Sequence, residues 1–489
     1  MIKKEVGTVV QNTAALLARY QSIIPDIAAL ERVLHTALPQ TAWFNALRVD
    51  REQLKQSFAK NSLEALPWCE DGFRFDSDIV LGKSWQYRVG LLQIQEEVSM
   101  LPVKCLAPLP TDCVLDMCAA PGNKTAQLAV AMQNQGTIVA NDIHYQRLRA
   151  LGQITQRLGL MNINFHVGDG TSLPRAPAVF DKILVDAPCS CEGTLRKGRS
   201  RVVLSSKANS ENMAVTQIAL LKKAIQLLKP GGRLVYSTCT FAPEENECVI
   251  DTILKQYAAE MVLCPIDIAH FSAQPGITFW QGRRLSSELE KAWRIWPHLN
   301  NTGGFFIAVL EKKEKTSAAT LSPTVLPQSE LRYAQTSAVS DFVSVVQQRF
   351  SISPSQLARY HYYMPSNRGI YAAHRSNLAL YAQPLSSFQC DSVGLFFIKT
   401  RIRYPKLSSA AVMAIGHLAT AHVVELKAPQ LPAFLSREDI RVSPEQRVRC
   451  AQTGYVVVKY NDIAIGLGLL FVRQETVEWV MRSLYPRYW

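Results

Sequence analysis

The sequence predicts an α/β fold built on a doubly wound, mostly parallel β-sheet. From Asp112 to about Lys313, apolar runs rich in β-branched residues alternate with amphipathic stretches of helical periodicity. In addition, successive runs end in polar residues, which core packing alone does not explain. Alternating strands and helices are typical of a parallel sheet with helices packed on it.

The strands are expected where the runs are most apolar. Six are predicted, within residues 112–119, 137–142, 163–169, 180–188, 232–240 and 303–312. Helices are predicted at residues 145–159 and 216–232, where apolar residues recur with helical spacing, and in the stretch "TAQLAVAM" after the first strand.

Shifts in composition divide the chain into four expected regions. Residues 1–100 mix helical periodicity with irregular pieces that contain Pro and Trp, and residues 101–313 hold the predicted sheet. Residues 314–333 are charged and then rich in Ser, Thr and Pro, which is typical of a linker. Residues 334–489 end in two β runs around Asn461–Asp462, which predict a hairpin in a small β-rich domain.

Composition favours a protein that works on a polyanion in the cytoplasm. The 489 residues carry 53 Lys and Arg against 40 Asp and Glu, a net charge of +13, although many proteins are basic for no such reason. We expect reduced thiols, because the eleven cysteines are odd in number and scattered over the chain, and because the N-terminus lacks the apolar core of a signal peptide. The apolar stretch from Ala410 is interrupted by His417 and His422, so no membrane span is expected.

The loop after the first predicted strand is a candidate ligand site. In the stretch "DMCAAPGNKT", Asp116 to Thr125, Asn123 stands where a phosphate-binding P-loop needs Gly, so that motif is excluded. The small residues Ala119, Ala120 and Gly122 allow a ligand to approach the backbone, and the amides of the next helix favour a carboxylate. An ordinary tight turn explains the composition equally well.

Acids at the ends of the next two strands make a ligand more plausible. Asp142 ends the second strand, where such folds hold the ribose hydroxyls of a nucleoside cofactor, and Asp169 ends the third, placed to accept from an adenine amino group. For either acid alone, a solvated loop residue or a helix cap is an equal alternative.

Four motifs in this order and spacing give the chain a resemblance to a known family. "DMCAAPGNKT", "DAPCSCEGT", "YSTCTFAPEENE" and "RIWPHLNNTGGFFIA" resemble motifs of the Sun-type (Fmu/nucleolar protein) RNA cytosine-5 methyltransferases. Residues 41–50 and 89–102 are similar to that family's N-terminal RNA-binding region, so the resemblance covers most of residues 40–312. The tail is similar to the PUA-like RNA-binding unit of the bacterial 16S ribosomal RNA branch.

The resemblance implies a Rossmann-like core that uses S-adenosylmethionine to form 5-methylcytosine in RNA. A thiolate that adds to position 6 of cytosine makes position 5 nucleophilic, so covalent catalysis divides one hard step into easier ones. By resemblance, Cys239 attacks, Cys189 assists release of the product, and Asp186 binds the cytosine edge with Lys124 as its charge partner. Cofactor contacts are implied at Cys118, Ala119, Ala120, Pro121, Gly122, Asn123, Lys124, Asp142, Asp169 and Asp186.

Proximity of Cys239 to Lys124 is expected to lower the pKa of the thiol. A zinc site is not expected, because Cys189 and Cys191 lack the C-x-x-C spacing and no second ligand pair follows. A disulfide between these two cysteines would be strained.

The chain departs from the family pattern at several positions. Asn123 and Cys191 stand where Gly is usual, so the turn at Cys191 is expected to be altered. Trp43 replaces the Arg of the N-terminal motif while Asn45 remains, which weakens a phosphate contact there. The basic run 196–201 is either a phosphate-facing loop or a solvated charge run.

A flipped cytosine requires a grip on the RNA backbone elsewhere. Besides the run 196–201, we expect Lys399, Arg401 and Arg403 on one face of a strand, with Tyr404 and Tyr460 as stacking candidates or ordinary sheet aromatics.

The expected substrate is 16S ribosomal RNA or the small subunit, with transfer RNA as the alternative. A non-catalytic RNA-binding or assembly factor built on a decayed methyltransferase is a second hypothesis. The protein is expected to be a cytoplasmic monomer without a metal.

Overall fold

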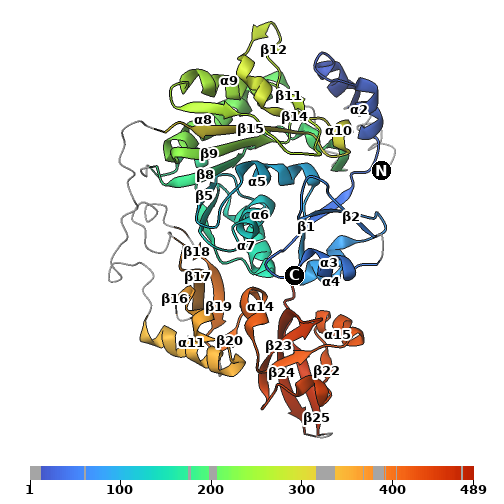
Figure 1. Cartoon of the computed structure of the whole chain (residues 1–489), viewed down its shortest axis with the longest axis vertical. Helices are drawn as coiled ribbons and strands as arrows, with labels where there is room; N and C mark the ends of the chain where they lie inside the picture. The colour runs from blue at the N-terminus through green and yellow to red at the C-terminus, as the bar shows by residue number, and fades with distance from the viewer. Residues whose placement is uncertain are drawn as a thin grey trace.

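The computed structural model describes residues 13–59, 62–174, 178–197, 206–314, 336–366, 368–377, 390, 392–402, 405–474 and 477–489. In Figure 1 a large central sheet occupies the upper part, the N-terminal strands β1 and β2 lie to its right, and two smaller C-terminal sheets lie below. No helix in these ranges combines the length and the apolar character that a membrane crossing requires.

The central sheet has ten strands in the order β11-β14-β15-β9-β8-β5-β6-β7-β18, with β10 paired to β15. The five strands β5 to β9 run parallel, and the flanking strands are antiparallel, so the prediction of a doubly wound sheet is confirmed for its centre. All six predicted strands are present. The ten are β5 (Cys113–Asp116), β6 (Thr137–Asp142), β7 (Ile163–Val167), β8 (Phe180–Asp186), β9 (Leu228–Thr238), β10 (Met261–Cys264), β11 (Gln274–Pro275), β14 (Trp293–Ile295), β15 (Phe305–Lys312) and β18 (Ser392–Val393).

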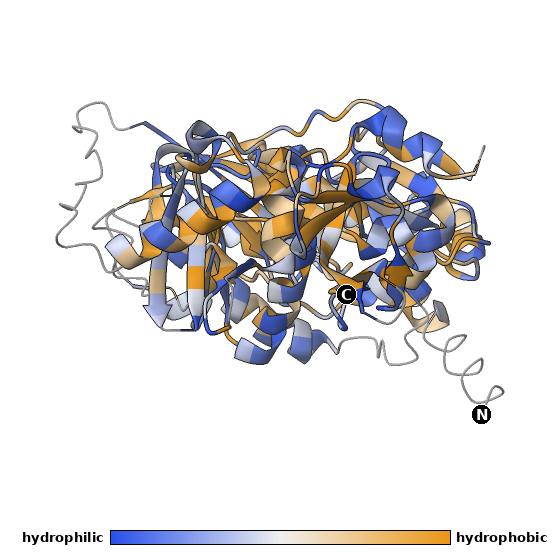
Figure 2. Ribbon diagram, turned by 90° about the horizontal axis from the view of Figure 1, so that it is seen from below, coloured by the Kyte–Doolittle hydropathy of each residue, from blue (hydrophilic) through white to orange (hydrophobic). Residues whose placement is uncertain are grey.

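Helices cover both faces of this sheet. Successive side chains of a strand point to opposite faces, so Val114 packs in one apolar cluster and Leu115 in the other. One face carries α5 (Leu101–Leu106), α6 (Asn123–Ala131) and α7 (Tyr145–Leu158). The other carries α8 (Lys207–Leu227), which begins earlier than predicted, and α9 (Glu247–Gln256). Figure 2 shows apolar residues concentrated in the interior strands.

The N-terminal region forms its own antiparallel sheet, in the order β2-β3-β1-β4. Its elements are α2 (Ile27–Leu34), β1 (Gln40–Phe44), α3 (Arg51–Gln56), β2 (Leu63–Ala65), β3 (Gly72–Phe75), α4 (Trp85–Arg88) and β4 (Leu92–Ile94). Asp50 starts α3 with a capping box that it shares with Gln53, which satisfies free amides of the first turn.

The C-terminal part is β-rich, as predicted. A four-stranded sheet contains β16 (Tyr360–Ser366), β17 (Gly369–His374), β19 (Leu395–Lys399) and β20 (Lys406–Leu407). A five-stranded sheet contains β21 (Val423–Glu425), β22 (Asp439–Arg441), β23 (Gly454–Tyr460), β24 (Ile463–Arg473) and β25 (Glu478–Ser483). The main helices of this part are α11 (Ser337–Phe350), α12 (Pro354–Leu357), α14 (Ser409–Ile415) and α15 (Leu431–Leu435).

The predicted hairpin is confirmed between β23 and β24. Asn461 and Asp462 both adopt positive φ angles, 49° and 60°, as a two-residue type I′ turn requires. Smaller elements complete the fold: α10 (Pro297–Asn300) and the paired strands β12 (Phe279–Trp280) and β13 (Arg283–Arg284).

The division into four regions stays a prediction. The proposed linker, 314–333, lies outside the described residues except for Glu314. The C-terminal part also contacts the rest of the chain closely, because β18 adds to the edge of the central sheet beside β7.

Candidate active site

A cavity opens at the carboxyl ends of β5, β8 and β9. Strands β6 and β7 continue the sheet on one side of β5 and strands β8 and β9 on the other, so β5 and β8 flank the switch point at which such sheets bind ligands. The cavity is lined by Glu96, Ser99, Asp116, Cys118, Ala119, Ala120, Pro121, Gly122, Asn123, Lys124, Asp186, Gly193, Thr194, Lys197, Cys239, Gly303, Gly304 and Phe305. The structure therefore brings the predicted loop, Asp186 and Cys239 to one place.

The loop between β5 and α6 approaches the cavity with its backbone. Gly122 has a φ of 113°, and a Cβ there would lie 2.4 Å from Leu151, so only glycine fits. Gly122 caps α6 without a side-chain hydrogen bond, which leaves amides of the first turn for a ligand. Asn123, the departure from the family, accepts from Gln93 Nε2 at 2.8 Å and ties the helix to the N-terminal sheet.

Asp116 is a site residue that the predicted residue set lacks. It ends β5, it is 1% exposed, and its Oδ2 accepts from Thr125 Oγ1 at 2.7 Å. Its Oδ1 is buried without a hydrogen-bond partner among the described residues. Burial, opposed by the Thr125 hydrogen bond and assisted by the charge of Asp186, raises the pKa of Asp116 to about 7. The signal in the sequence was its place as the first residue of the loop motif.

The ion pair between Lys124 and Asp186 is confirmed. Lys124 Nζ lies 2.7 Å from Asp186 Oδ2, and Ser237 Oγ donates to Asp186 Oδ1 at 2.7 Å. Burial lowers the pKa of Lys124, but its attraction to Asp186 outweighs this, and the pKa lies above its usual value. The amine is therefore charged at neutral pH, and the carboxylate edge is oriented from both sides.

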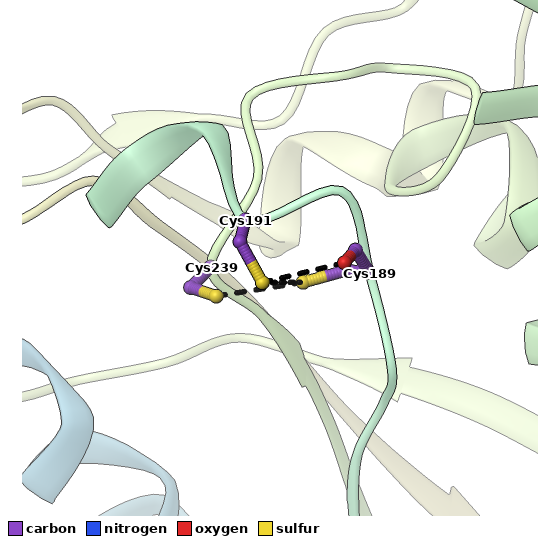
Figure 3. Close-up of side chains that lie close together, drawn as sticks. All are labelled: Cys189, Cys191 and Cys239. Carbon is purple, nitrogen blue, oxygen red and sulfur yellow. Dashed lines mark hydrogen bonds between the residues drawn. The ribbon is translucent and has the colours of Figure 1, made fainter. Parts of the chain in front are cut away.

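Three thiols converge beside this ion pair (Figure 3). Cys189 and Cys191 belong to the loop after β8, and Cys239 follows β9. The Sγ atoms of Cys189 and Cys239 are 3.5 Å apart, and those of Cys189 and Cys191 are 4.0 Å apart.

The expectation of a low pKa for Cys239 is wrong in this structure. The hydrogen bond with Cys189 lowers the pKa of Cys239, but the interaction with Cys191 and burial raise it by more. The pKa of Cys189 is also well above that of a free thiol, because of its hydrogen bonds with Cys191 and Cys239 and its burial. Both side chains are therefore neutral thiols at neutral pH.

Two glycines hold the loop after β8 against β9. Gly193 N donates to Cys239 O at 2.8 Å and Gly304 N donates to Gly193 O at 2.9 Å. A Cβ on Gly193 would lie 2.3 Å from Gly304 O, so the approach requires glycine. Cys191 has a φ of 59°, which explains why the family favours glycine at this position.

A buried carboxylate, Glu245, anchors the same loop, and the predicted residue set lacks it. Its Oε1 accepts from Ser190 Oγ at 2.6 Å, and its Oε2 accepts from Ser190 N at 3.1 Å and from Gln217 Nε2 at 3.0 Å. Its position in the motif "YSTCTFAPEENE", six residues after Cys239, was the available signal.

Asp142 and Asp169 stand at the strand ends where they were predicted, but neither lines this cavity. Asp142 is buried, and it accepts from Ala120 N at 3.2 Å and from His144 N at 3.0 Å, so it supports the loop. Asp169 is exposed and caps the short 3-10 helix η3 (Gly170–Ser172) through Thr171. The helix-cap alternative therefore holds for Asp169, and the ligand roles of both acids stay predictions.

Several predicted RNA contacts have internal partners instead. Arg196 of the basic run is 7% exposed, and it donates to Thr302 O at 2.8 Å and Asn301 Oδ1 at 2.6 Å, so it does not face a phosphate. Lys197 lines the cavity, and residues 198–201 lie outside the described residues. Trp43 and Asn45 are also buried.

The RNA contacts predicted in the C-terminal part are not confirmed either. Strand β19 ends at Lys399 and Arg401 lies in a bend, so their placement on one strand face is wrong, while Arg403 and Tyr404 lie outside the described residues. Tyr460 packs edge-on against Trp85 at 5.2 Å between ring centroids, which supports its reading as a sheet aromatic.

The fold is that of an α/β methyltransferase. A solved structure described as a methyltransferase homolog protein from Pyrococcus horikoshii is 31% identical, covers 63% of this chain and 99% of its own, and superposes with a TM-score of 0.55. Residues 103–311 match the family model described as 16S rRNA methyltransferase RsmB/F.

Curated relatives extend the match. Ribosomal RNA small subunit methyltransferase F of Aeromonas salmonicida is 32% identical over 83% of this chain and 82% of its own length. The tRNA (cytosine(49)-C(5))-methyltransferase of Pyrococcus abyssi is 36% identical over 61% of this chain and 95% of its own. The chain belongs to the RsmB/F family, within the RNA cytosine-5 methyltransferases, and the resemblance is confirmed. The alternative of a non-catalytic factor is set aside.

The cavity fits S-adenosylmethionine, the methyl donor of this family. The unpartnered Asp116 Oδ1 suits an amine, and the small residues with the free amides after Gly122 suit a carboxylate. Residues Cys118 to Lys124 and Asp116 would hold it, and when bound it supplies an electrophilic methyl group.

Proposed function

We propose that this chain methylates position 5 of a cytosine in 16S ribosomal RNA through a covalent bond between Cys239 and position 6. The observation that carries the proposal is the Cys189–Cys239 pair at 3.5 Å, set in the same pocket region as the Lys124–Asp186 ion pair. A single buried thiol is usually a packing residue, whereas paired thiols beside a charged pair need a chemical reason.

Each of these residues has its own role in the proposed reaction. Asp186, fixed by Lys124 and Ser237, accepts from the exocyclic amine of cytosine and disfavours uracil, which presents a carbonyl there. The Cys239 thiol gives its proton to solvent as its sulfur bonds to position 6, which makes position 5 nucleophilic. Position 5 then forms a bond to the methyl group, whose bond to the sulfonium of the donor breaks. Finally, a water takes the proton from position 5 as the bond between the Cys239 sulfur and position 6 breaks. Cys189 lies within contact of that sulfur and assists its release.

The raised pKa values of the two thiols determine when each thiol loses or keeps its proton. Cys239 is neutral before substrate binds, so its proton must leave when the cytosine enters. Cys189 keeps its own proton and can donate a hydrogen bond to the departing thiolate.

The extent of the matches favours ribosomal RNA. The relative named for the small ribosomal subunit aligns over 83% of this chain, whereas the relative named for tRNA aligns over 61%. About two fifths of this chain therefore lies outside the match to the tRNA relative. We assign RNA binding to residues 1–100 and 334–489 and place a PUA-like unit in residues 334–489. We also propose that the protein is a monomer and acts in the cytoplasm.

Bisulfite sequencing of total RNA tests the substrate. A strain that lacks this chain should lose one 5-methylcytosine in 16S ribosomal RNA, and the full chain should restore it while Cys239→Ala should not. Loss of a mark in transfer RNA, with ribosomal RNA unchanged, would overturn the choice of substrate.

A further inference from the structure

The third thiol of the cluster has no part in the proposed reaction. Cys191 has a left-handed backbone conformation, with a φ of 59°, which glycine adopts more easily, and the residue is exposed. The cluster of Cys189, Cys191 and Cys239 places all three Sγ atoms within 4.8 Å of one another (Figure 3).

The sulfur positions match the spacing of ligands around one thiophilic cation. A tetrahedral Zn²⁺ with Zn–S bonds of about 2.3 Å separates its sulfurs by about 3.8 Å. Two of the sulfur separations here are 3.5 Å and 4.0 Å, one on each side of that value. Within the described ranges this is the one group of three such ligands that meets a common distance limit.

We propose that Cys189, Cys191 and Cys239 form a binding site for a thiophilic divalent cation, with Zn²⁺ as the preferred ion. The three thiols release three protons to solvent and bind as thiolates, which soft and borderline metals prefer over oxygen ligands. Because Cys191 is exposed, the fourth position of the ion faces solvent. The positive charge of Lys124 is balanced by Asp186 and does not oppose the cation.

The site escaped the sequence argument because its ligands are not local. Cys189 and Cys191 lack the spacing of a zinc pair, and the third ligand lies 50 residues further on, at the end of the neighbouring strand β9. The parallel pairing of β8 and β9 brings the two segments together.

Occupation of this site has a consequence that rests on the proposed function. An ion held by Cys189 and Cys239 engages both thiols that the methylation requires. The metal-bound chain is therefore inactive, and removal of the metal restores the reaction.

Titration of the reduced, metal-free full chain tests the site directly. With Co²⁺ as the probe, the ultraviolet thiolate-to-metal charge-transfer band should saturate at one ion per chain, and Zn²⁺, which binds more tightly, should displace it. Cys191→Gly, which restores the residue that the backbone favours, should weaken binding at least about tenfold. Cys264→Ser, a half-buried cysteine outside the cluster, is the matched control and should bind as the natural chain does.

Three results would overturn the proposal: no charge-transfer band, equal binding by Cys191→Gly, or equal loss in Cys264→Ser. Thermal unfolding of each variant establishes that it is folded. In an activity arm, Zn²⁺ should inhibit the natural chain, and Cys191→Gly should require at least about tenfold more Zn²⁺ to lose half of its own metal-free rate. If no chain methylates RNA under any condition, the proposed function fails, while the spectroscopic titration still decides the metal site.

Discussion

At the scale of single residues, two neutral thiols in contact can perform different tasks. Cys189 and Cys239 lie 3.5 Å apart, sulfur to sulfur, and both pKa values lie above that of a free thiol. Cys239 lines the cavity and is placed to attack, while Cys189 touches it from outside the lining and is placed to assist its departure.

We expect Cys189→Ala to trap a protein–RNA adduct. The variant retains Cys239, so it should still bond to cytosine and accept the methyl group, but release should be slow without the neighbouring thiol. Denaturing electrophoresis with labelled RNA and S-adenosylmethionine should show a retarded band that accumulates at least about tenfold over the natural chain.

Cys239→Ala is the matched control for this experiment. It should form no adduct, because no nucleophile remains for position 6, and the double variant should behave in the same way. An adduct that persists in Cys239→Ala and disappears in Cys189→Ala would exchange the two roles.

Asp116 should make stability depend on pH near neutrality. Burial raises its pKa from 3.8 to about 7, so the folded chain keeps a proton that the unfolded chain has released. The stability that this proton contributes therefore falls as the pH rises between these two values and is lost above the upper one. Between pH 5 and pH 7 this contribution falls by about 2 kcal/mol, since the folded group is half titrated near pH 7.

Asp116→Asn removes this titration while it keeps an oxygen for Thr125. Relative to the variant, the natural chain should lose about 2 kcal/mol of unfolding free energy between pH 5 and pH 7. Urea unfolding of both proteins at the two pH values measures the difference. A difference that is the same at both values would show that Asp116 is already ionised in the folded chain at pH 5.

The sequence alone predicted the site residues that belong to local motifs. Lys124, Asp186, Cys189 and Cys239 lie together as expected, since each ends a strand or begins a helix at one edge of the sheet. It did not predict the partners of Arg196, which come from Thr36 and Asn301, more than 100 residues away. Nor did it predict the thiol pKa values, because burial and neighbouring side chains set them.

At the scale of elements, the loop after β8 is fixed by contacts from three directions. Glu245 accepts hydrogen bonds from Ser190, and Gly193 pairs with Cys239 and Gly304, next to the ends of β9 and β15. The 3-10 helix η4 (Glu192–Lys197) contacts the N-terminal helical segment 13–20. That segment supplies Arg19 and Tyr20 to the buried carboxylate of Glu192.

Tyr20→Phe should destabilise the chain through this loop. The Tyr20 hydroxyl donates to Glu192 Oε2 at 2.7 Å, and both side chains are fully buried. Loss of a buried hydrogen bond to a charged group costs about 1.5–3 kcal/mol. Urea unfolding measures the change, with Tyr145→Phe, an exposed tyrosine, as the control. A loss no larger than that of the control would show that the N-terminal segment does not support the loop.

The strands were predictable as elements because their signal is local. Apolar runs rich in β-branched residues placed all six core strands, and the Asn461–Asp462 turn placed the hairpin. Short strands such as β11 and β18 were not predicted, because two residues carry no pattern and only tertiary pairing creates them.

At the scale of the whole molecule, the C-terminal part covers apolar surface of the N-terminal sheet. One buried cluster joins Phe44, Leu54 and Leu92 of the N-terminal region to Phe434 and Tyr485 of the C-terminal part. Polar contacts reinforce it, since Tyr485 Oη donates to Arg88 O at 2.7 Å and Arg88 donates to Leu435 O at 2.7 Å. A sequence-based division into regions could not reveal this shared core.

Tyr485→Ala tests whether the C-terminal part folds independently of the N-terminal sheet. Tyr485 is 1% exposed and packs on Phe434, with ring centroids 5.9 Å apart, so truncation should cost about 3–5 kcal/mol. Because the cluster spans both parts, hydrogen exchange in β1 and β4 should accelerate along with exchange in β24. Tyr488→Ala, which changes an exposed tyrosine near the same end of the chain, is the control and should alter neither. Unchanged protection of β1 and β4 beside a loosened β24 would show that the two parts are independent folding units.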